Sequence, residues 1–558
     1  MKLHTATPIL AAPALLFASW VVVSETAYAN EGEALYNEYC ASCHAASLRG
    51  SAHGAPLSGP AFTDKWSQQS ALTLRDYQQS EMPPGEAHTL SLVQHSAITQ
   101  FVVAQSNLPE DSPLSSSVND LQNVSSEAPD AVKFSAADSV MDFARNAGTY
   151  SMKRITDFRN VDTAELDNPP DEDWLNWRRT PDGHGHSPLT QISKDNVSRL
   201  SLDWSMAMHS GSNQPTPLVH DGVMFLTHPH NKIQAIEAAT GELIWEYQYA
   251  FPPAAKMLGG PTRNIALWQD RLFLATYDAA LVAIDAASGK QLWRAEKADY
   301  RDAYTHSAGP LVAAGVVVSG INGCELFTED GCFITGHDPE TGQELWRTST
   351  LALPDTPEYA SWGEVAPDRR GGGDVWIAGS YDPELDLVYF GTSQPKPWAA
   401  ASRGMSVDDD ALYTNSTLAL RPRTGELVWH FQHVPGETID MEVGFERILA
   451  DIEGTPTLLT VGKDGILWKI NRATGEYIDL LDTMEQNIFD VDRNTGTLSY
   501  REDIATAAIG DTYTACPGIY GGHNWQSATY DADRYLLFLP LHQLCSDMTP
   551  REVDLGPG

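Results

Sequence analysis

The chain has 558 residues, which is enough for two or more domains. Its 36 lysines and arginines stand against 74 aspartates and glutamates and give a net charge of −38. Such acidity argues against nucleic acid or an anionic membrane as the binding partner, and it suits either a salty medium or docking to a basic partner.

The first 29 residues have the pattern of a secretory signal peptide. Lys2 precedes an apolar run from Ile9 to Val23, and Ala27-Tyr28-Ala29 has the form of a cleavage site. An uncleaved membrane anchor is the weaker alternative, because the run is short and Pro8 and Pro13 interrupt its start. We therefore expect a soluble mature chain in the periplasm.

Residues 30–110 are predicted to form a small all-α domain, because Leu92 to Val103 has a helical apolar period. Within it, Cys40-Ala41-Ser42-Cys43-His44 fits the pattern C-x-x-C-H. Two thiols in this pattern bind a haem covalently, and the adjacent imidazole binds its iron. A redox C-x-x-C pair is the alternative, but no thioredoxin-like pattern surrounds it. The prediction is one haem c, attached through Cys40 and Cys43, with His44 as proximal ligand.

Met82 is the predicted distal ligand. It is the only methionine between the haem motif and Met141, and it opens Met82-Pro83-Pro84-Gly85, whose prolines would stiffen the loop. His53 and His88 are the competing ligands, and a bis-His or open site is the alternative. The whole segment resembles class I cytochrome c domains, and methionine ligation implies a haem that carries electrons rather than oxygen.

Residues 111–165 are predicted to be a linker. From Asn107 to about Pro129 the sequence is rich in serine, proline and acidic residues and has too little apolar surface to fold alone. Residues 130–165 are ambiguous.

Beyond Asp173 short β-runs alternate with turns, and one unit recurs: a strand, a Thr-Gly or Ser-Gly turn, and a strand carrying tryptophan. Repetition at roughly fifty residues indicates a β-propeller, with a solenoid as the weaker alternative. The glycine supplies a positive φ, and the tryptophan can pack between blades. The full copies end at Trp245, Trp293, Trp346 and Trp429, and Thr474-Gly475 and Thr495-Gly496 are degenerate copies without tryptophan.

Four cysteines remain outside the haem motif. An even number in an oxidising compartment predicts two disulfides, with four buried thiols as the alternative. Three connectivities are possible, and we favour the two local ones, Cys324–Cys332 and Cys516–Cys545.

From Asp173 to about Met548 the chain resembles the quinoprotein alcohol dehydrogenases, all-β propellers that use pyrroloquinoline quinone (PQQ) and Ca²⁺. The resemblance implies such a propeller for residues 166–558. The matching motifs are Asp173-Trp174-Leu175-Asn176-Trp177, His186-Ser187-Pro188-Leu189, Thr216-Pro217-Leu218-Val219, Gly372-Gly373-Asp374-Val375-Trp376 and Gly391-Thr392-Ser393-Gln394-Pro395-Lys396-Pro397-Trp398.

PQQ is a flat tricarboxylate, so its site needs aromatic stacking and cationic partners. The resemblance implies that Trp376 is the floor under the quinone and that Arg263 binds a carboxylate. It assigns Ser307 and Asn322 to hydrogen bonds with the cofactor and brings Asn524, in Gly521-Gly522-His523-Asn524-Trp525, within its reach.

The resemblance also implies a calcium site. A hard cation takes oxygen ligands, and Glu325, Gln394 and Asp410 match the ligand positions, although Gln394 stands where asparagine is usual. A plain surface acid is the alternative for Glu325. Lanthanide-preferring relatives have an acid where this chain has Leu412, so calcium is favoured.

Asp410 is also the predicted base for the alcohol hydroxyl, with Asp409 and Asp408 as the runners-up. It matches a family segment in which an aspartate precedes Leu-Tyr by one residue. Lys463 stands at the position of a basic residue near the quinone oxygen and the base.

These expectations combine into a periplasmic quinohaemoprotein dehydrogenase that oxidises a primary or secondary alcohol. Electrons would pass from PQQ to the haem and then to a soluble cytochrome or a membrane respiratory chain. The alternative is an electron-transfer cytochrome fused to a propeller that only binds a partner. A PQQ sugar dehydrogenase of another propeller type is disfavoured by the tryptophan repeats. Relatives close eight blades, whereas we count about five and part of a sixth, so the propeller is expected to be incomplete.

Overall fold

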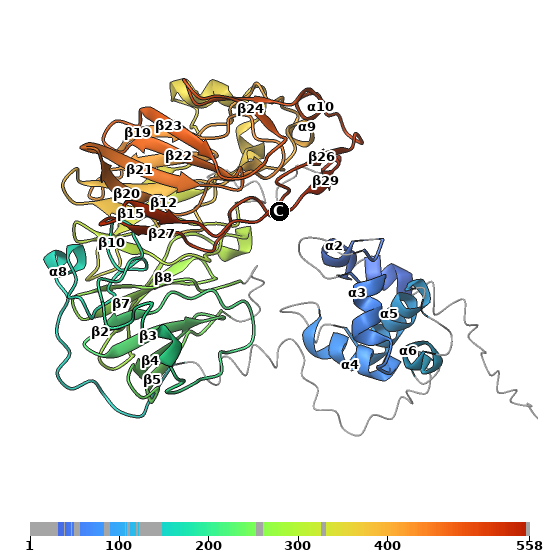
Figure 1. Cartoon of the computed structure of the whole chain (residues 1–558), viewed down its shortest axis with the longest axis horizontal. Helices are drawn as coiled ribbons and strands as arrows, with labels where there is room; N and C mark the ends of the chain where they lie inside the picture. The colour runs from blue at the N-terminus through green and yellow to red at the C-terminus, as the bar shows by residue number, and fades with distance from the viewer. Residues whose placement is uncertain are drawn as a thin grey trace, which may run out of the picture. The chain divides into compact units, whose positions relative to one another are not determined.

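The computed structural model describes residues 32–37, 39–45, 47–49, 56–82, 90–106, 108, 112–118, 121, 148–252, 260–324 and 331–553. The chain divides into two compact units, residues 1–135 and 136–558 (Figure 1). The predicted signal peptide lies outside the described residues. Within them, no helix combines the length and apolar content that a membrane crossing needs.

The first unit is helical, as predicted. Its apolar core includes Tyr36, Phe62, Leu74, Val102 and Leu114. The helix expected over Leu92 to Val103 is confirmed, and it begins with a capping box in which Ser91 and Gln94 satisfy each other's backbone N–H groups. Its helices are α2 (Ala41–His44), α3 (Pro60–Trp66), α4 (Ala71–Glu81), α5 (Leu92–Gln105) and α6 (Pro113–Ser116).

A close backbone crossing fixes the chain that leads into the haem motif. Residues 32–37 are helical, and a Cβ built on Gly32 would lie 2.3 Å from the carbonyl oxygen of Ala97 on α5. One turn later the ring centroid of Tyr36 lies 5.2 Å from that of Phe101. Only glycine permits this approach, so the turn carrying Cys40 is anchored to α5.

The described residues of the second unit form five antiparallel sheets of four strands that follow one another in chain order, the first of which gains a fifth strand from the segment before it (Figure 1). They are β2 (Leu218–His220), β3 (Val223–His228), β4 (Lys232–Glu237) and β5 (Leu243–Gln248); β6 (Ala266–Trp268), β7 (Arg271–Ala275), β8 (Ala280–Asp285) and β9 (Gln291–Glu296); β10 (Leu311–Ala313), β11 (Val316–Ser319), β12 (Phe333–His337) and β13 (Glu344–Ser349); β15 (Ser380–Asp382), β16 (Leu387–Gly391), β18 (Ser416–Leu420) and β19 (Leu427–Gln432); and β20 (Ile448–Ile452), β21 (Thr455–Val461), β22 (Ile466–Asn471) and β23 (Tyr477–Asp482).

Shorter elements complete this unit. Four strand pairs join β14 (Gly371–Gly372) with β17 (Pro395–Lys396), β24 (Phe489–Asp492) with β25 (Thr497–Tyr500), β26 (Tyr513–Ala515) with β29 (Ser546–Met548), and β27 (Thr529–Asp531) with β28 (Leu536–Phe538). The short helices of its described residues are α8 (Thr163–Asp167), α9 (Ala400–Arg403), α10 (Glu502–Ala505) and four 3₁₀ turns, at Val197–Arg199, Tyr300–Asp302, Pro357–Trp362 and Pro367–Arg369.

Each repeated tryptophan packs against the turn glycine of the next sheet, as the repeat predicts. A Cβ built on Gly289 would lie 2.6 Å from the ring of Trp245, and the Trp245 Nε1–H donates to the carbonyl oxygen of Ala286 at 3.1 Å. Trp293 repeats this arrangement against Gly342. The same contact is made by Trp346 with Gly425 and by Trp429 with Gly475.

Two further aromatic residues extend the series beyond the predicted copies. Tyr477 follows its turn glycine by two residues rather than by four, yet it makes the same contact: its ring lies against Gly496, and its hydroxyl donates to the carbonyl oxygen of Arg493 at 2.8 Å. Before the first sheet, Trp204 lies against Gly241 and donates to Ala238 at 3.1 Å. The contact therefore tolerates tyrosine, which is why a search for tryptophan alone misses it.

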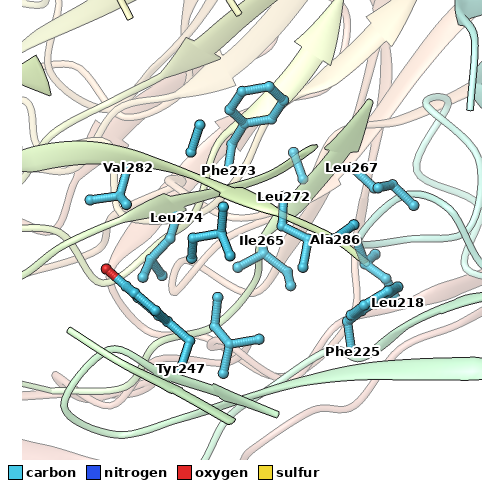
Figure 2. Packing of buried hydrophobic residues seen from close by; sticks show 14 of the residues in the cluster. Leu218, Phe225, Tyr247, Ile265, Leu267, Leu272, Phe273, Leu274, Val282 and Ala286 are labelled. Carbon is cyan, nitrogen blue, oxygen red and sulfur yellow. The ribbon is translucent and has the colours of Figure 1, made fainter. Parts of the chain in front are cut away.

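The first two sheets share a continuous apolar core (Figure 2). Phe225 and Ile233 from the first sheet and Phe273 and Val282 from the second are fully buried in it. Most residues of β4, β7 and β8 are buried in succession, so both faces of these strands are covered. Such a core fixes the relative positions of neighbouring sheets and of the loops that project from them.

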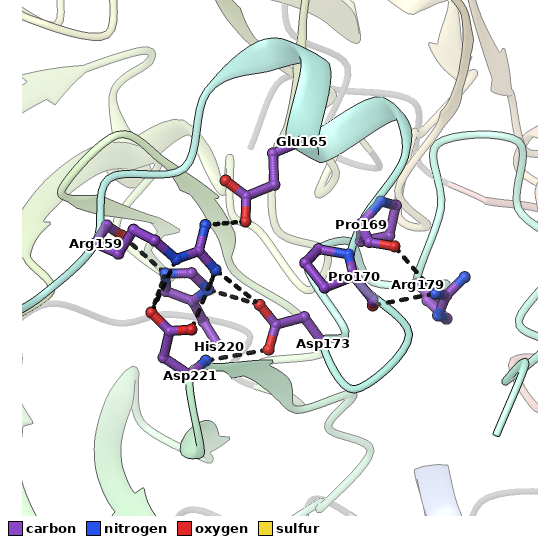
Figure 3. Close-up of polar contacts among 8 residues, drawn as sticks. All are labelled: Arg159, Glu165, Pro169, Pro170, Asp173, Arg179, His220 and Asp221. Carbon is purple, nitrogen blue, oxygen red and sulfur yellow. Dashed lines mark hydrogen bonds and ion pairs between the residues drawn. The ribbon is translucent and has the colours of Figure 1, made fainter.

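The segment that leads into the propeller is held by a strand and by an ion-pair cluster. β1 (Gly148–Ser151) pairs antiparallel with β5. The Arg159 guanidinium then donates to Glu165, Asp173 and Asp221 (Figure 3). The buried imidazole of His220 lies 2.9 Å from the same Asp173 carboxylate. Both ends of the predicted linker, residues 112–117 and 148–165, therefore carry structure, because they gain tertiary contacts that composition does not reveal.

Both predicted disulfides are present. Cys324 pairs with Cys332 across a Cα–Cα distance of 5.5 Å, and Cys516 pairs with Cys545 at 4.4 Å. Each closes a local loop, as the favoured connectivity requires.

The packing of tryptophan on glycine gives a test. Gly289→Ala places a methyl group against Trp245, whereas Gly222→Ala has the same positive φ and open space around it. We expect the left-handed backbone alone to cost about 1–2 kcal/mol in Gly222→Ala and overpacking to add about 1–3 kcal/mol in Gly289→Ala. Urea unfolding followed by fluorescence measures both. Equal losses would contradict the inter-blade role of this contact.

Candidate functional site

The C-x-x-C-H motif forms one helical turn, α2 with Cys40 at its N-cap, and Cys40 and Ala41 pack against the apolar core of the first unit. The His44 N–H donates to the carbonyl oxygen of Cys40 at 2.9 Å, and the Tyr36 hydroxyl donates to that of Ala45 at 2.7 Å. Burial raises the pKa of Tyr36 to about 12, so the phenol remains a donor. Cys40 and His44 are half-buried, whereas the Cys43 side chain lies outside the described part. A thiol and an imidazole on one fixed turn fit covalent haem attachment.

Met82 lies where α4 ends. Its N–H donates to the carbonyl oxygen of Gln78 at 2.9 Å, and the residue is half-buried. The competing ligands His53 and His88 fall outside the described residues, as do residues 83–89. The distal ligand therefore stays a prediction.

Four of the predicted PQQ residues form one chain of contacts in the propeller. The Arg263 guanidinium carbon lies 4.7 Å from the ring centroid of Trp376. The Nη1 of Arg263 donates to the carbonyl oxygen of Ser307 at 3.2 Å, and the Ser307 N–H donates to the Asn322 side chain at 3.0 Å. Arg263, Ser307 and Trp376 precede β6, β10 and β15, and Asn322 follows β11, so three sheets contribute to the cluster.

Arg263 has binding capacity left. Its Nε is buried and has no hydrogen-bond partner among the described residues. Burial lowers the pKa of the guanidinium, and a nearby anion would offset the cost of that burial. The Arg263 guanidinium lies over the Trp376 indole and keeps an unused N–H donor. This combination fits a flat ligand that carries several carboxylates.

Lys463 is joined to the same cluster by two acids that the sequence did not single out. Its Nζ lies 2.9 Å from Asp440 Oδ2 and 2.7 Å from Glu442 Oε1. The other Glu442 oxygen accepts the Nε1–H of Trp376 at 2.8 Å. The signal that could have found them is the alternation of Glu437, Asp440 and Glu442 with apolar residues between β19 and β20.

The electrostatics of these buried groups are mutually dependent. Burial lowers the pKa of Lys463, but the carboxylates of Asp440 and Glu442 outweigh it and hold that pKa above its ordinary value. Burial raises the pKa of Asp440 despite Lys463, and Glu442 and Glu437 raise it further. The lysine is therefore charged and shared between two acids.

Gln394 has the free oxygen that a metal ligand needs. The residue is 3% exposed, and its Oε1 is buried with no partner among the described residues. The preceding Ser393 donates to Asp374 at 3.1 Å, and Asp374 accepts the N–H groups of Gly323 and Cys324. Asp374 thus links the residue before Gln394 to Gly323 and Cys324. The predicted ligand Glu325, next in sequence, lies outside the described residues.

Asn415 is a second buried amide beside Gln394, and sequence reasoning did not identify it. Asn415 is fully buried, and neither its Oδ1 nor its Nδ2 has a partner within the described ranges. Its N–H donates to the carbonyl oxygen of Ser393 at 2.9 Å, which places it next to Gln394. An asparagine in a strand-like run carries no sequence signal that marks it as buried.

Asp410 lies apart from this network. The residue is exposed, and its carbonyl oxygen accepts from Gln432. Partial burial and the neighbouring Asp409 raise the pKa of its carboxyl group. Among the described residues, no hydrogen bond or ion pair joins it to Gln394 or Lys463, so its role as base and metal ligand stays a prediction.

The segment that carries Asn524 contacts Lys463 through Gly522. Its Nδ2 donates to the carbonyl oxygen of Tyr520, and the N–H of Gly522 donates to that of Lys463 at 2.8 Å. The residue after it, Trp525, helps to line a cavity of about 180 Å³ that Arg263 also borders. Indoles and guanidinium groups in its wall suit an aromatic anion.

Two family models match the chain, one in each unit. Residues 174–488 match the family described as "Glucose/ethanol/alcohol dehydrogenase, beta-propeller domain". Residues 27–102 match the family described as "Cytochrome C oxidase, cbb3-type, subunit III".

Among curated proteins, the chain is 33% identical over 410 residues to quinohemoprotein alcohol dehydrogenase ADH-IIG of Pseudomonas putida, covering 69% of this chain and 56% of the relative. The solved structure of ADH-IIG superposes with a TM-score of 0.66 at 31% identity, covering 72% of this chain and 62% of that one. A europium-containing methanol dehydrogenase gives a TM-score of 0.64 at 25% identity, covering 71% and 73%. The chain thus spans little more than half the length of the curated relatives it matches.

Met82 can be tested directly. In Met82→Ala the haem iron loses its thioether, so we expect the reduction potential to fall and the visible spectrum of the oxidised protein to change. Met152→Ala, at an exposed methionine of the propeller, serves as the matched control. An unchanged spectrum and potential in Met82→Ala would assign the distal position to His53, His88 or no side chain.

Proposed function

Because the chain belongs to the PQQ-dependent glucose/ethanol/alcohol dehydrogenase family of β-propellers, we propose that it is a quinohaemoprotein alcohol dehydrogenase. It oxidises a primary or secondary alcohol and delivers the electrons through its own haem c to an external acceptor. The alcohol class comes from the names of relatives such as ADH-IIG. The predicted signal peptide supports a periplasmic location.

The observation that carries this proposal is the contact chain from Ser307 through Arg263 and Trp376 to Glu442 and Lys463. It gathers an indole, a guanidinium and an ammonium group from separate sheets. When bound there, PQQ supplies the hydride acceptor, and haem c supplies the one-electron carrier. Without such a ligand, the buried Nε of Arg263 would have no evident role.

The chain's own residues have separable tasks in this proposal. Arg263, Ser307 and Asn322 bind the carboxylates and carbonyls of the cofactor. Trp376 supports its plane, and Lys463 and Asn524 approach its oxygens. Each contact orients the flat ring rather than reacting with it.

The metal site is proposed from oxygen donors. Gln394, with its unused buried Oε1, Glu325 and Asp410 would hold Ca²⁺, a cation that takes six to eight oxygen ligands. Asp410 would accept the hydroxyl proton of the alcohol, since a carboxylate with a raised pKa is a stronger base.

The proposal is tested by haem reduction. The full chain, loaded with haem and supplied with PQQ and Ca²⁺, is mixed with a panel of alcohols while haem absorbance is followed. We expect reduction that requires both PQQ and an alcohol. No reduction, with no PQQ retained, would instead identify an electron-transfer cytochrome joined to a propeller that binds a partner.

The base assignment predicts opposite outcomes for two neighbours. Asp410→Asn removes the proton acceptor, so turnover should fall by about two to four orders of magnitude. Asp409→Asn keeps the base but removes the negative charge that raises the pKa of Asp410. That pKa then falls, the base stays ionised at lower pH, and the acidic limb of the kcat/KM profile should move to lower pH. If Asp409→Asn abolishes turnover and Asp410→Asn does not, the roles are exchanged.

A further inference from the structure

Glu442 joins the aromatic floor of the proposed quinone site to its cation. One carboxylate oxygen accepts the Trp376 Nε1–H at 2.8 Å, and the other lies 2.7 Å from Lys463 Nζ. Glu442 is 5% exposed and Lys463 is 7% exposed. Because each oxygen has its own partner, the side chain cannot rotate without breaking one of the two contacts.

We propose that Glu442 is the positioning residue of the quinone site: it fixes the plane of Trp376 and sets the charge that Lys463 presents to the cofactor. This inference rests on the proposed function and assigns a role to a residue outside the predicted set. Glu442 acts through Trp376 and Lys463 and need not touch the cofactor itself.

The first part of the role is geometric. The rings of Phe445 and Trp376 pack in a T-shaped arrangement, with their centroids 5.3 Å apart and their planes at 83°. The guanidinium carbon of Arg263 lies 4.7 Å from the indole centroid. These contacts limit how far the indole can tilt. The hydrogen bond to Glu442 fixes its rotation within its own plane, because the Nε1–H has one direction.

The second part is electrostatic. Arg263 and Lys463 are cations of the cluster, Glu442 is an anion beside Lys463, and Asp440 is a second acid whose pKa burial raises, so the acids offset part of the positive charge before a ligand enters. A tricarboxylate is attracted by the cations and repelled by the anions. Glu442 therefore lowers the affinity that charge alone would give and, through Trp376, improves the fit of the ring.

These two parts predict different shifts for two substitutions at one position. In Glu442→Gln the amide oxygen can still accept the Trp376 Nε1–H, the amide NH2 then faces Lys463, and Lys463 keeps Asp440, so the repelling charge and its hold on Lys463 are lost. The Kd for PQQ should fall about three- to tenfold. In Glu442→Leu the same charge is lost and the Trp376 Nε1–H also loses its acceptor, so the Kd should lie about tenfold above that of Glu442→Gln. Titration of the PQQ-free full chain with PQQ in Ca²⁺ buffer measures both.

Glu246 supplies a matched control in the first blade. One of its oxygens lies 2.7 Å from Lys232 Nζ, and the other accepts from Gln234 Nε2 at 2.7 Å. Glu246→Gln should leave the Kd for PQQ unchanged.

The outcomes separate this inference from the proposed function. If the wild-type chain does not bind PQQ, the proposed function fails, and the inference fails with it. If the wild type binds PQQ but Glu442→Gln does not tighten binding, or Glu442→Leu binds PQQ as tightly as Glu442→Gln, only the inference is overturned. The same holds if Glu246→Gln matches Glu442→Gln, since the effect would then be a general loss of charge.

Discussion

The contact of an aromatic ring with a turn glycine is the constraint on which the propeller depends. A Cβ on Gly289, Gly342 or Gly425 would lie within 2.7 Å of a tryptophan ring from the sheet before it. No other residue permits this distance, and glycine also supplies the positive φ of the turn. Each contact therefore fixes one sheet relative to the next, and a short chain motif determines long-range geometry.

The functional cluster inherits its precision from that arrangement. Arg263, Ser307 and Trp376 stand at the starts of three successive sheets, and Glu442 and Lys463 come from the fifth. Each of these side chains is at least 21 residues from the next in the sequence. A small rotation of one sheet would separate the Arg263 guanidinium from the Trp376 ring, because dispersion and cation–π attraction fall off within a few ångströms.

Sequence reasoning succeeded where structure is local or periodic. The turn glycines, α5, both disulfides and the meeting of Arg263 with Trp376 follow from spacing or from resemblance. It missed Tyr477, because the contact needs a flat ring rather than an indole. It also missed Asp440 and Glu442, because acids in an irregular loop usually indicate solvent, and only tertiary packing shows that they are buried with Lys463. Asp410 remains undecided, since an exposed loop carboxylate has no fixed neighbour to identify its role.

The overall charge and the proposed ligand impose opposite requirements on this chain. A protein of net charge −38 repels a tricarboxylate at long range, but salt screens that repulsion beyond about 8–10 Å. Inside the cluster the distances are shorter and screening is weaker, so the local balance of charges decides. Two cations without their acids would bind the anion tightly but would be costly to bury. Two acids beside Lys463 reduce that cost and leave Arg263, with its unused Nε, as the group most available to a carboxylate. The buried acids thus let an acidic protein retain a folded, cation-containing site for an anionic ligand.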